Sequence, residues 1–359
     1  MTSNSETTPR RLGKANTCRA DSGAGLTNIL IIRLSSFGDI VLAEPVSRLV
    51  REHYPGCNIW FLANEEYTGI PNLFEAVDTV LPYFRVGSND RLMGMIGDVD
   101  FDVVVDLQNS RRSRALISRL SVRRVLRHRR QVIRRFLTVY LPWVWKGSLK
   151  SSVRAYCDTL KPLGIRAAEL RPRIRVAARD TRDLNREQMD GIHIGICPGG
   201  SSEHKRWSEA KFAALISCLS QKGYRTGLIG SETDRAVIES IARLVRDENV
   251  QIRVCGDVQS AASVLSRCRV TISNDSGLMH LASAVSSSVV GILGPTSPVL
   301  GFAPAAQGHV VLTEGLACSP CSYHGNRPCR YGDRQCMDRI DAHDVAALVE
   351  DMICGGSSG

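Results

Sequence analysis

The stretch NILIIRLSSFGD (28–39) decides the fold class. Its first half is a short apolar run rich in isoleucine, which is typical of a buried strand. A Ser-Ser-Phe-Gly turn follows, and apolar residues then recur at helical spacing from Asp39 to His53. A strand, a tight turn and a helix in this order predict the first unit of a parallel α/β sheet.

The same alternation recurs along the chain. Further strands are predicted at 57–62, 77–81, 101–107, 192–197, 224–229, 270–273 and 289–293, and further helices from about 110, at 209–222, at 234–246, from about 276 and at 341–352, where Asp341 is the expected N-cap. We therefore predict a disordered leader (1–27), an N-terminal Rossmann-like domain (28–177), a polar linker (178–190), a C-terminal Rossmann-like domain (191–340) and a terminal helix (341–353). Ligands of such sheets bind beyond the carboxyl ends of the strands, so two facing domains predict a cleft.

Composition limits the class of protein. The 359 residues are 43% hydrophobic and 23% charged, which is typical of a folded globular protein, and the net charge of +10 favours anionic partners. The apolar runs are too short to span a bilayer, and the first 27 residues contain no apolar core of a secretory signal. Eight scattered cysteines are typical of a reducing compartment. We expect a cytoplasmic protein whose membrane contact, if present, is peripheral.

Polar motifs follow the predicted strands, and each has a plain alternative. Asp39 follows Ser36 and Gly38 at a helix start, where an aspartate is either a helix cap or a carboxylate that takes a proton from an attacking hydroxyl. In PGGSSEHKRW (198–207), glycines, hydroxyls and a lysine suit a phosphate, although a solvated loop would look similar. GSETD (230–234) offers an acid for ribose hydroxyls or a helix cap.

Two more motifs follow later strands. SNDSGLMH (273–280) places small residues at a helix start, where free backbone N–H groups bind a diphosphate. Ser276 and His280 share one helix face, and the alternative is a capped helix with a packed histidine. GILGPTSP (291–298) either closes over a ligand or is an ordinary turn.

These motifs, in this order, resemble glycosyltransferase family 9, the ADP-heptose:lipopolysaccharide heptosyltransferases, over about Asn28 to Ile353. CSPCSYHGNRPCRYGDRQCM (318–337) also resembles this family, and in particular its heptosyltransferase II branch. The resemblance implies a GT-B architecture and inverting transfer of heptose from ADP-heptose to the inner core of lipopolysaccharide. No cofactor is implied for catalysis.

The resemblance also assigns roles to residues. It implies that Asp39 is the general base, that Lys205 neutralises the diphosphate and that Glu232 holds the donor ribose. The acceptor belongs to the N-terminal domain, around Ser36 and Gly38. The remaining donor-binding candidates are Ser201, Ser202, Asp275, Ser276, Gly277, His280 and Thr296.

Arginines are concentrated in two places. The stretch RRVLRHRRQVIRR (123–135) contains basic residues and no acidic ones. It is either a solvated helix face or a surface for an anionic partner. Arg111, Arg112 and Arg114 lie near a helix start, where the helix dipole disfavours cations, which indicates phosphate binding by the acceptor site. Phosphorylated core sugars and an anionic inner-leaflet membrane both fit. No recognised nucleic-acid-binding motif occurs, so we expect no nucleic-acid partner.

Four cysteines, Cys318, Cys321, Cys329 and Cys336, lie within nineteen residues. They predict either a structural zinc or iron site or a loop of reduced thiols, because the spacing departs from two CxxC pairs. Two alternatives to lipopolysaccharide core transfer stay open here. One is a protein O-heptosyltransferase acting on an adhesin, and the other is a nucleotide-binding relative without catalysis.

Overall fold

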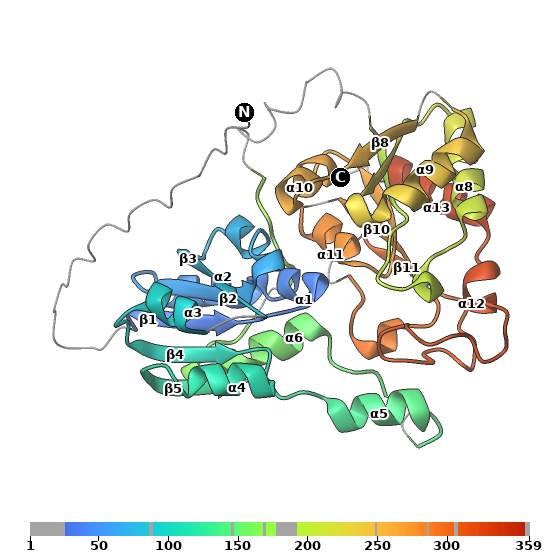
Figure 1. Cartoon of the computed structure of the whole chain (residues 1–359). Coiled ribbons are helices and arrows are strands. Elements are labelled where there is room, and N and C mark those ends of the chain that lie inside the picture. Colours follow the sequence, from blue (N-terminus) through green and yellow to red (C-terminus); the bar gives the residue numbers. More distant parts are fainter. Residues whose placement is uncertain are drawn as a thin grey trace, which may run out of the picture.

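The computed structural model describes residues 26–85, 89–144, 147–167, 170–176, 192–247, 250–285, 287–304 and 308–355. They form two α/β domains that lie side by side, which confirms the predicted fold class (Figure 1). The leader up to residue 25 and the linker at 178–190 lie outside the described residues. None of the described helices is long and apolar enough to cross a membrane.

The N-terminal domain contains a five-stranded parallel sheet in the order β3-β2-β1-β4-β5. Its strands are β1 (Asn28–Ile32), β2 (Asn58–Asn64), β3 (Thr79–Tyr83), β4 (Phe101–Asp106) and β5 (Val122–Arg127). Its helices are α1 (Phe37–Val41), α2 (Glu44–His53), α3 (Asn89–Ile96), α4 (Arg111–Ile117), α5 (Val132–Tyr140) and α6 (Ser152–Cys157).

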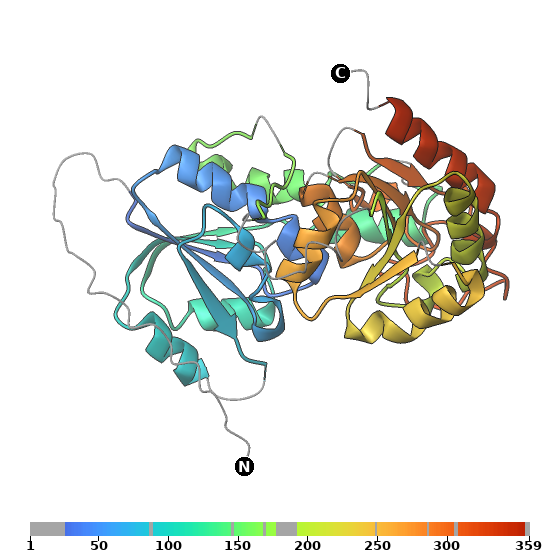
Figure 2. The same cartoon turned by 90° about the horizontal axis from the view of Figure 1, so that it is seen from above.

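The C-terminal domain contains a six-stranded parallel sheet in the order β11-β10-β9-β6-β7-β8. Its strands are β6 (Ile194–Cys197), β7 (Thr226–Gly230), β8 (Val250–Val254), β9 (Val270–Asn274), β10 (Ser288–Ile292) and β11 (Val310–Leu312). Its helices are α8 (Glu209–Gln221), α9 (Arg235–Val245), α10 (Val258–Leu265), α11 (Gly277–Ala284), α12 (Gln335–Asp338) and α13 (Ala342–Gly355). Seen from above, helices flank both sheets (Figure 2).

Central position in the sheet explains the apolar runs. Strand β1 pairs in parallel with β2 and β4, and Ile29, Leu30, Ile31 and Ile32 are all fully buried. A strand covered on both faces has no polar face, so its sequence reads as a continuous apolar run. The polar residues therefore begin where β1 ends, which places the Ser-Ser-Phe-Gly-Asp turn at the carboxyl edge of the sheet.

The prediction of a single helix at 39–53 is wrong. The structure divides it into α1 and α2, with Leu42 and Ala43 between them. Pro45 is the cause, because a proline lacks the backbone N–H that would continue α1 and is tolerated only in the first turn of a helix. The division leaves α1 short, with Asp39 in its first turn.

The basic stretch at 123–135 does not form a solvated helix face, which was one of its two interpretations. Most of its first half is the edge strand β5, and its end is the start of α5. Exposed arginines occupy an edge strand well, since charged side chains discourage pairing with another chain.

The two domains share a packed interface. One cluster of buried apolar side chains runs from the N-terminal sheet through α2 and α6 to α10 and α11. Helices α1 and α11 lie in direct contact there. A Cβ atom added to Gly277 would lie 2.4 Å from the Phe37 ring, so only glycine permits this approach.

Candidate active site

Asp39 lies at the carboxyl end of β1, held by three groups. Its Oδ2 atom is 2.7 Å from Arg33 Nη2 and accepts a hydrogen bond from Ser36 Oγ at 3.0 Å, and its Oδ1 atom accepts one from Tyr156 Oη at 2.7 Å. Oδ2 also accepts from the Ser36 backbone N–H at 3.3 Å, so the helix-cap interpretation is confirmed. The cap does not exclude a chemical role.

The surroundings of Asp39 keep it ionised. Burial raises the pKa of the Asp39 carboxyl, but the Arg33 charge and the hydrogen bonds from Tyr156 and Ser36 outweigh it and bring the pKa to about 2. Burial also raises the pKa of Tyr156, so its hydroxyl stays protonated and continues to donate. The carboxylate is therefore negative at every physiological pH.

A second charged cluster joins three strand ends of the C-terminal domain. Lys205 Nζ is 2.7 Å from Asp275 Oδ2, which also accepts a hydrogen bond from Thr296 Oγ1 at 2.7 Å. These residues follow β6, β9 and β10, which are neighbours in the sheet, so the predicted candidates Lys205, Asp275 and Thr296 are brought together. Burial raises the pKa of Asp275, but the Lys205 charge and the hydrogen bonds from Lys205 and Thr296 act against burial, and the net shift is downward. The Asp275 carboxyl is therefore ionised.

His280 lies between the two clusters. It is buried on α11, and a Cβ atom added to Gly38 would lie 2.5 Å from its ring, so Gly38 is the point where the N-terminal motif meets the C-terminal one. Burial lowers the pKa of the imidazole, while the charges of Asp275 and Asp39 raise it. The net shift is downward, so His280 is neutral at neutral pH. The structure thus brings Asp39 and Asp275 around one histidine.

Beside these clusters lies a cavity of about 560 Å³, lined by both domains. Backbone-rich segments form much of its wall: Gly199, Gly200 and Ser201 after β6, and Ser276, Gly277 and Leu278 at the start of α11. The first N–H groups of a helix have no partner within the helix and favour anions. The wall also carries carboxylates and hydroxyls suited to a sugar, among them Glu66, Asp234, Asp257 and Thr233.

Three of the predicted donor-binding residues, Ser201, Ser276 and Gly277, line this cavity. The others do not: Ser202, Lys205, Glu232, Asp275, His280 and Thr296. Glu232 is largely exposed and pairs with Arg235 at 2.6 Å, whereas its neighbours Ser231, Thr233 and Asp234 do line it. Ser202 instead accepts a hydrogen bond from the His204 backbone N–H. The alternative for the 230–234 motif, a helix cap, is confirmed for Asp234, which accepts from the Ser231 N–H at 3.0 Å.

The predicted acceptor arginines follow β4, next to β1. Ser110 caps α4 by accepting a hydrogen bond from the Ser113 N–H, as the predicted helix start implied. Arg111, Arg112 and Arg114 are exposed, and Arg114 donates to the Asn109 side chain at 2.9 Å. They lie at the same carboxyl edge as Asp39, on the surface of the N-terminal domain.

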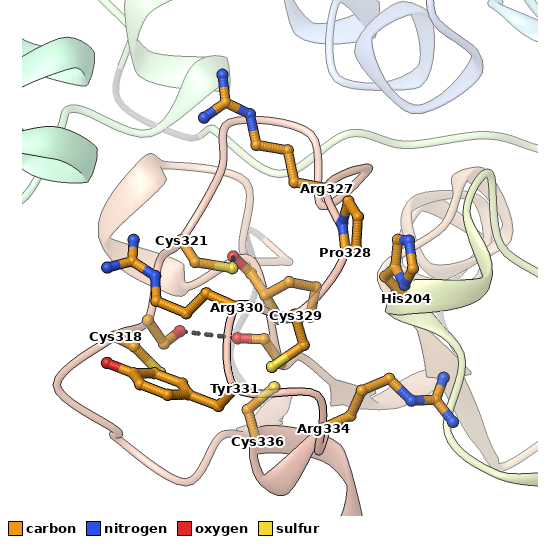
Figure 3. Close-up of a pocket in the computed structure, with 13 residues that line it drawn as sticks. His204, Cys318, Cys321, Arg327, Pro328, Cys329, Arg330, Tyr331, Arg334 and Cys336 are labelled. Atoms are coloured by element: carbon orange, nitrogen blue, oxygen red, sulfur yellow. Dashed lines mark hydrogen bonds between the residues drawn. The ribbon is translucent and has the colours of Figure 1, made fainter.

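The cysteine cluster lines a separate cavity of about 190 Å³, together with His204 and Arg334 (Figure 3). The labelled thiols lie around one hollow, and Ser319 Oγ donates to the Gly294 carbonyl at 2.7 Å beside it. Within the part of the chain that the structure describes, no three His, Cys, Asp or Glu side chains are placed to hold a metal ion.

Sequence reasoning missed three residues that shape the site. Arg33 ends the apolar β1 run, and Tyr156 lies in a stretch without a motif. Gly325 belongs to the cysteine-rich loop, where a Cβ atom would lie 2.5 Å from Lys205 Cε, so this loop packs directly on the lysine. The sequence offered two signals for these residues: an arginine directly after an apolar strand, and a glycine after Tyr-His.

Two parallel-sheet domains with a cavity between them define the GT-B class. Residues 90–331 match the sequence profile of glycosyltransferase family 9 (heptosyltransferase). The chain belongs to this family and is a glycosyltransferase.

Known proteins agree with this assignment. Lipooligosaccharide heptosyltransferase 2 of Haemophilus influenzae is 27% identical over 296 residues, which are 76% of this chain and 84% of that protein. The structure of E. coli ADP-heptose lps heptosyltransferase II covers 92% of this chain and all of its own, with 20% identity and a TM-score of 0.71. E. coli heptosyltransferase WaaC with ADP covers 91% of this chain and all of its own, with 19% identity and a TM-score of 0.70.

Proposed function

We propose that this enzyme transfers heptose from ADP-heptose to the inner core of lipopolysaccharide, with inversion at the anomeric carbon. The observation that carries the proposal is the ionised Asp39 carboxylate on α1, the short helix whose first residue, Phe37, lines a cavity walled by glycines and the N-terminus of α11. The names of the relatives support the donor and the acceptor, since the Haemophilus influenzae protein acts in lipooligosaccharide heptosyl transfer and the WaaC structure contains ADP.

The donor fits the C-terminal half of the cavity. Its diphosphate would lie against Gly199, Gly200, Ser201 and the N-terminus of α11, where backbone N–H groups and the helix dipole favour a negative group. The adenosine would extend toward the wall that contains Thr233. We retain Glu232 as the ribose ligand, although it must leave Arg235 to reach the ribose.

Bond making and breaking follow from the two charged clusters. The acceptor hydroxyl oxygen attacks the anomeric carbon of heptose, and its proton passes to Asp39 Oδ1 or Oδ2. The bond from that carbon to the β-phosphate oxygen breaks, and the electron pair leaves with ADP. Lys205 stabilises the charge that grows on the diphosphate, which is the kind of electrostatic effect that contributes most to many enzymes.

The acceptor would bind the N-terminal domain, with Ser36 and Gly38 next to the attacking hydroxyl and Arg111, Arg112 and Arg114 facing phosphates of the core. We also propose that the enzyme is cytoplasmic and peripheral at the inner face of the cytoplasmic membrane. The support is an exposed run of arginines on β5 and before α5, since anionic lipid headgroups attract such a surface.

No metal is assigned to the transfer, because Lys205 supplies the positive charge at the leaving group. The structural zinc or iron predicted at the cysteine cluster is a separate proposal. Elemental analysis of the protein purified without chelators tests it. About one equivalent per chain would support a metal, and a metal-free protein of full stability would contradict it.

Calorimetric titration with ADP, UDP, GDP and CDP tests the donor. We expect ADP to bind most tightly. Preference for another nucleotide would reject heptose while leaving the glycosyltransferase assignment in place, and binding of none would contradict the proposed donor site.

A further inference from the structure

Helix α5 and the turn after it carry an unusual surface. The large apolar side chains Val132, Ile133, Phe136, Trp143 and Val144 are all exposed, with exposed fractions from 48% to 76%. The other exposed large apolar side chains of the described residues are dispersed over several elements: Met95, Leu244, Ile252 and Tyr331. Exposed apolar residues concentrated in one segment indicate an interaction site, whereas isolated ones do not.

Hydrogen bonds and packing hold this segment in place. Gln131 and Lys150 exchange hydrogen bonds and close its base, and the Leu149 N–H donates to the Val299 carbonyl of the C-terminal domain at 2.9 Å. Val139 is buried against Leu300. One side of α5 is thus packed on the body of the protein, and the exposed apolar side chains are not the consequence of a loose loop.

A cationic groove of about 910 Å³ lies directly beside the apolar residues. Its lining includes six cationic side chains: Arg127, Arg129, Arg130, Arg134, Lys150 and Lys161. Asp158 is the one acidic side chain in this lining, and it pairs with Lys150 at 2.8 Å and Lys161 at 2.9 Å. Adjacent apolar and cationic side chains match the two layers of an anionic bilayer surface, where acyl chains lie beneath phosphates.

The same helix reaches toward the active site. Arg135, the next residue but one after the exposed Ile133, is half-buried, and its guanidinium lies 5.0 Å above the Phe302 ring of the C-terminal domain. Burial lowers the pKa of Arg135, while Tyr156 and Asp39 act in the opposite direction. Helix α5 therefore extends from the apolar surface to a contact with the C-terminal domain.

We propose that residues 129–144 dock the enzyme on an anionic phospholipid bilayer, with the apolar side chains of 132–144 entering the headgroup region and the arginines pairing with lipid phosphates. This deepens the proposed function, because a lipid-linked acceptor would be presented next to Asp39 without leaving the membrane. The partner is the lipid surface itself and not the acceptor molecule.

The test is sedimentation of the full chain with vesicles of phosphatidylethanolamine and phosphatidylglycerol, compared with vesicles of phosphatidylcholine alone. The variant Ile133→Asp with Trp143→Asp alters the two most exposed apolar residues of the segment, and the matched control is Met95→Asp with Leu244→Asp, which adds the same charge elsewhere. We expect the first variant to bind the anionic vesicles about tenfold more weakly and the control to resemble wild type. Replacing Arg129 and Arg130 by Gln should weaken binding about fivefold for each charge and reduce its salt dependence.

Activity separates this inference from the proposed function. The Ile133→Asp, Trp143→Asp variant should transfer heptose normally to a deacylated core oligosaccharide and more slowly to vesicle-embedded acceptor. Equal vesicle binding by this variant and wild type would overturn the docking surface, as would failure of wild type to bind anionic vesicles. A dimer that only this variant disrupts, with vesicle binding unchanged, would show that the surface meets a second copy of the chain. Absence of transfer by wild type would contradict the proposed function, and the vesicle measurement would still stand.

Discussion

In the N-terminal domain, Asp39 is held by Arg33 at 2.7 Å, and in the C-terminal domain, Lys205 is held by Asp275 at the same distance. The surroundings of the two functional groups differ. Both oxygens of Asp39 have partners, because Tyr156 and Ser36 also donate to it. The Lys205 ammonium can donate three hydrogen bonds, and Asp275 is its one charged partner among the described residues.

This difference indicates how each group meets its substrate. Lys205 can bind a phosphate oxygen and keep Asp275, because donor capacity remains. Asp39 must exchange one contact before an acceptor hydroxyl can approach it, and the hydroxyls of Ser36 and Tyr156 are the exchangeable ones. The lysine is thus ready in advance for the diphosphate, whereas the acceptor side rearranges around a carboxylate that is always ionised.

Asp39→Asn should give the largest effect. The amide keeps the shape and cannot accept the proton, so turnover should fall about 10²- to 10⁴-fold while the dissociation constant for ADP changes little. Rapid-quench turnover and calorimetry on the same preparation measure both. Turnover close to wild type would reject Asp39 as the base.

Lys205→Ala should rank second. Turnover should fall about 10²- to 10³-fold, because charge on the leaving diphosphate loses its partner. The change also leaves Asp275 buried without a cation, which costs about 3 kcal/mol of the free energy of unfolding. Lys205→Arg, which retains the charge, is the control, and thermal denaturation separates instability from loss of catalysis. Full activity in a folded Lys205→Ala protein would remove the lysine from the mechanism.

Arg33→Met should change the pH dependence. Burial raises the pKa of Asp39, and Arg33 is the largest opposing influence, so without Arg33 this pKa should rise. In wild type the pKa of Asp39 is about 2, so its pH–activity profile should show no acid limb from this group near neutrality. The variant should lose activity as the pH falls through roughly 5, because the base becomes protonated there. Arg33→Lys is the control, and pH profiles that coincide for wild type and Arg33→Met would refute the argument.

Glu232→Ala should have the smallest effect. Glu232 is exposed and paired with Arg235 in the free enzyme, so its net contribution to donor binding is reduced by the cost of leaving that pair. We expect donor affinity to fall about threefold with turnover unchanged. Asp234→Asn, at a residue that lines the cavity, provides the comparison. A loss of a hundredfold or more for Glu232→Ala would show that the acid reorganises fully on binding.

The sequence predicted the fold and the positions of the motifs because both follow local rules. Buried parallel strands read as apolar runs, and the polar residues that follow them must lie at the carboxyl edge, which placed Asp39, Lys205 and Asp275 correctly at strand ends. The helix that Pro45 divides was predictable from the proline itself. The capping role of Asp341 was also predicted and is confirmed by its hydrogen bond from the His343 N–H.

The partners of the site residues were not predictable in the same way. Tyr156 reaches Asp39 across 117 positions of the chain, and Gly325 packs on Lys205 from a loop whose cysteines drew attention instead. Such contacts depend on the packing of α6 and of the cysteine-rich loop, which no local pattern encodes. Strand β5 was missed for a related reason, since its sequence, VRRVLR (122–127), contains neither a continuous apolar run nor a regular apolar alternation.

The most direct test of the central claim is a transfer assay with purified wild type, ADP-heptose and a lipopolysaccharide core acceptor that lacks the terminal inner-core heptose, with the product analysed by mass spectrometry and by NMR of the new anomeric centre. The account predicts a product that is heavier by one heptosyl residue, with the anomeric configuration inverted relative to the donor, and one ADP released for each transfer. Retained configuration, or ADP release without a heptosylated product, would contradict it.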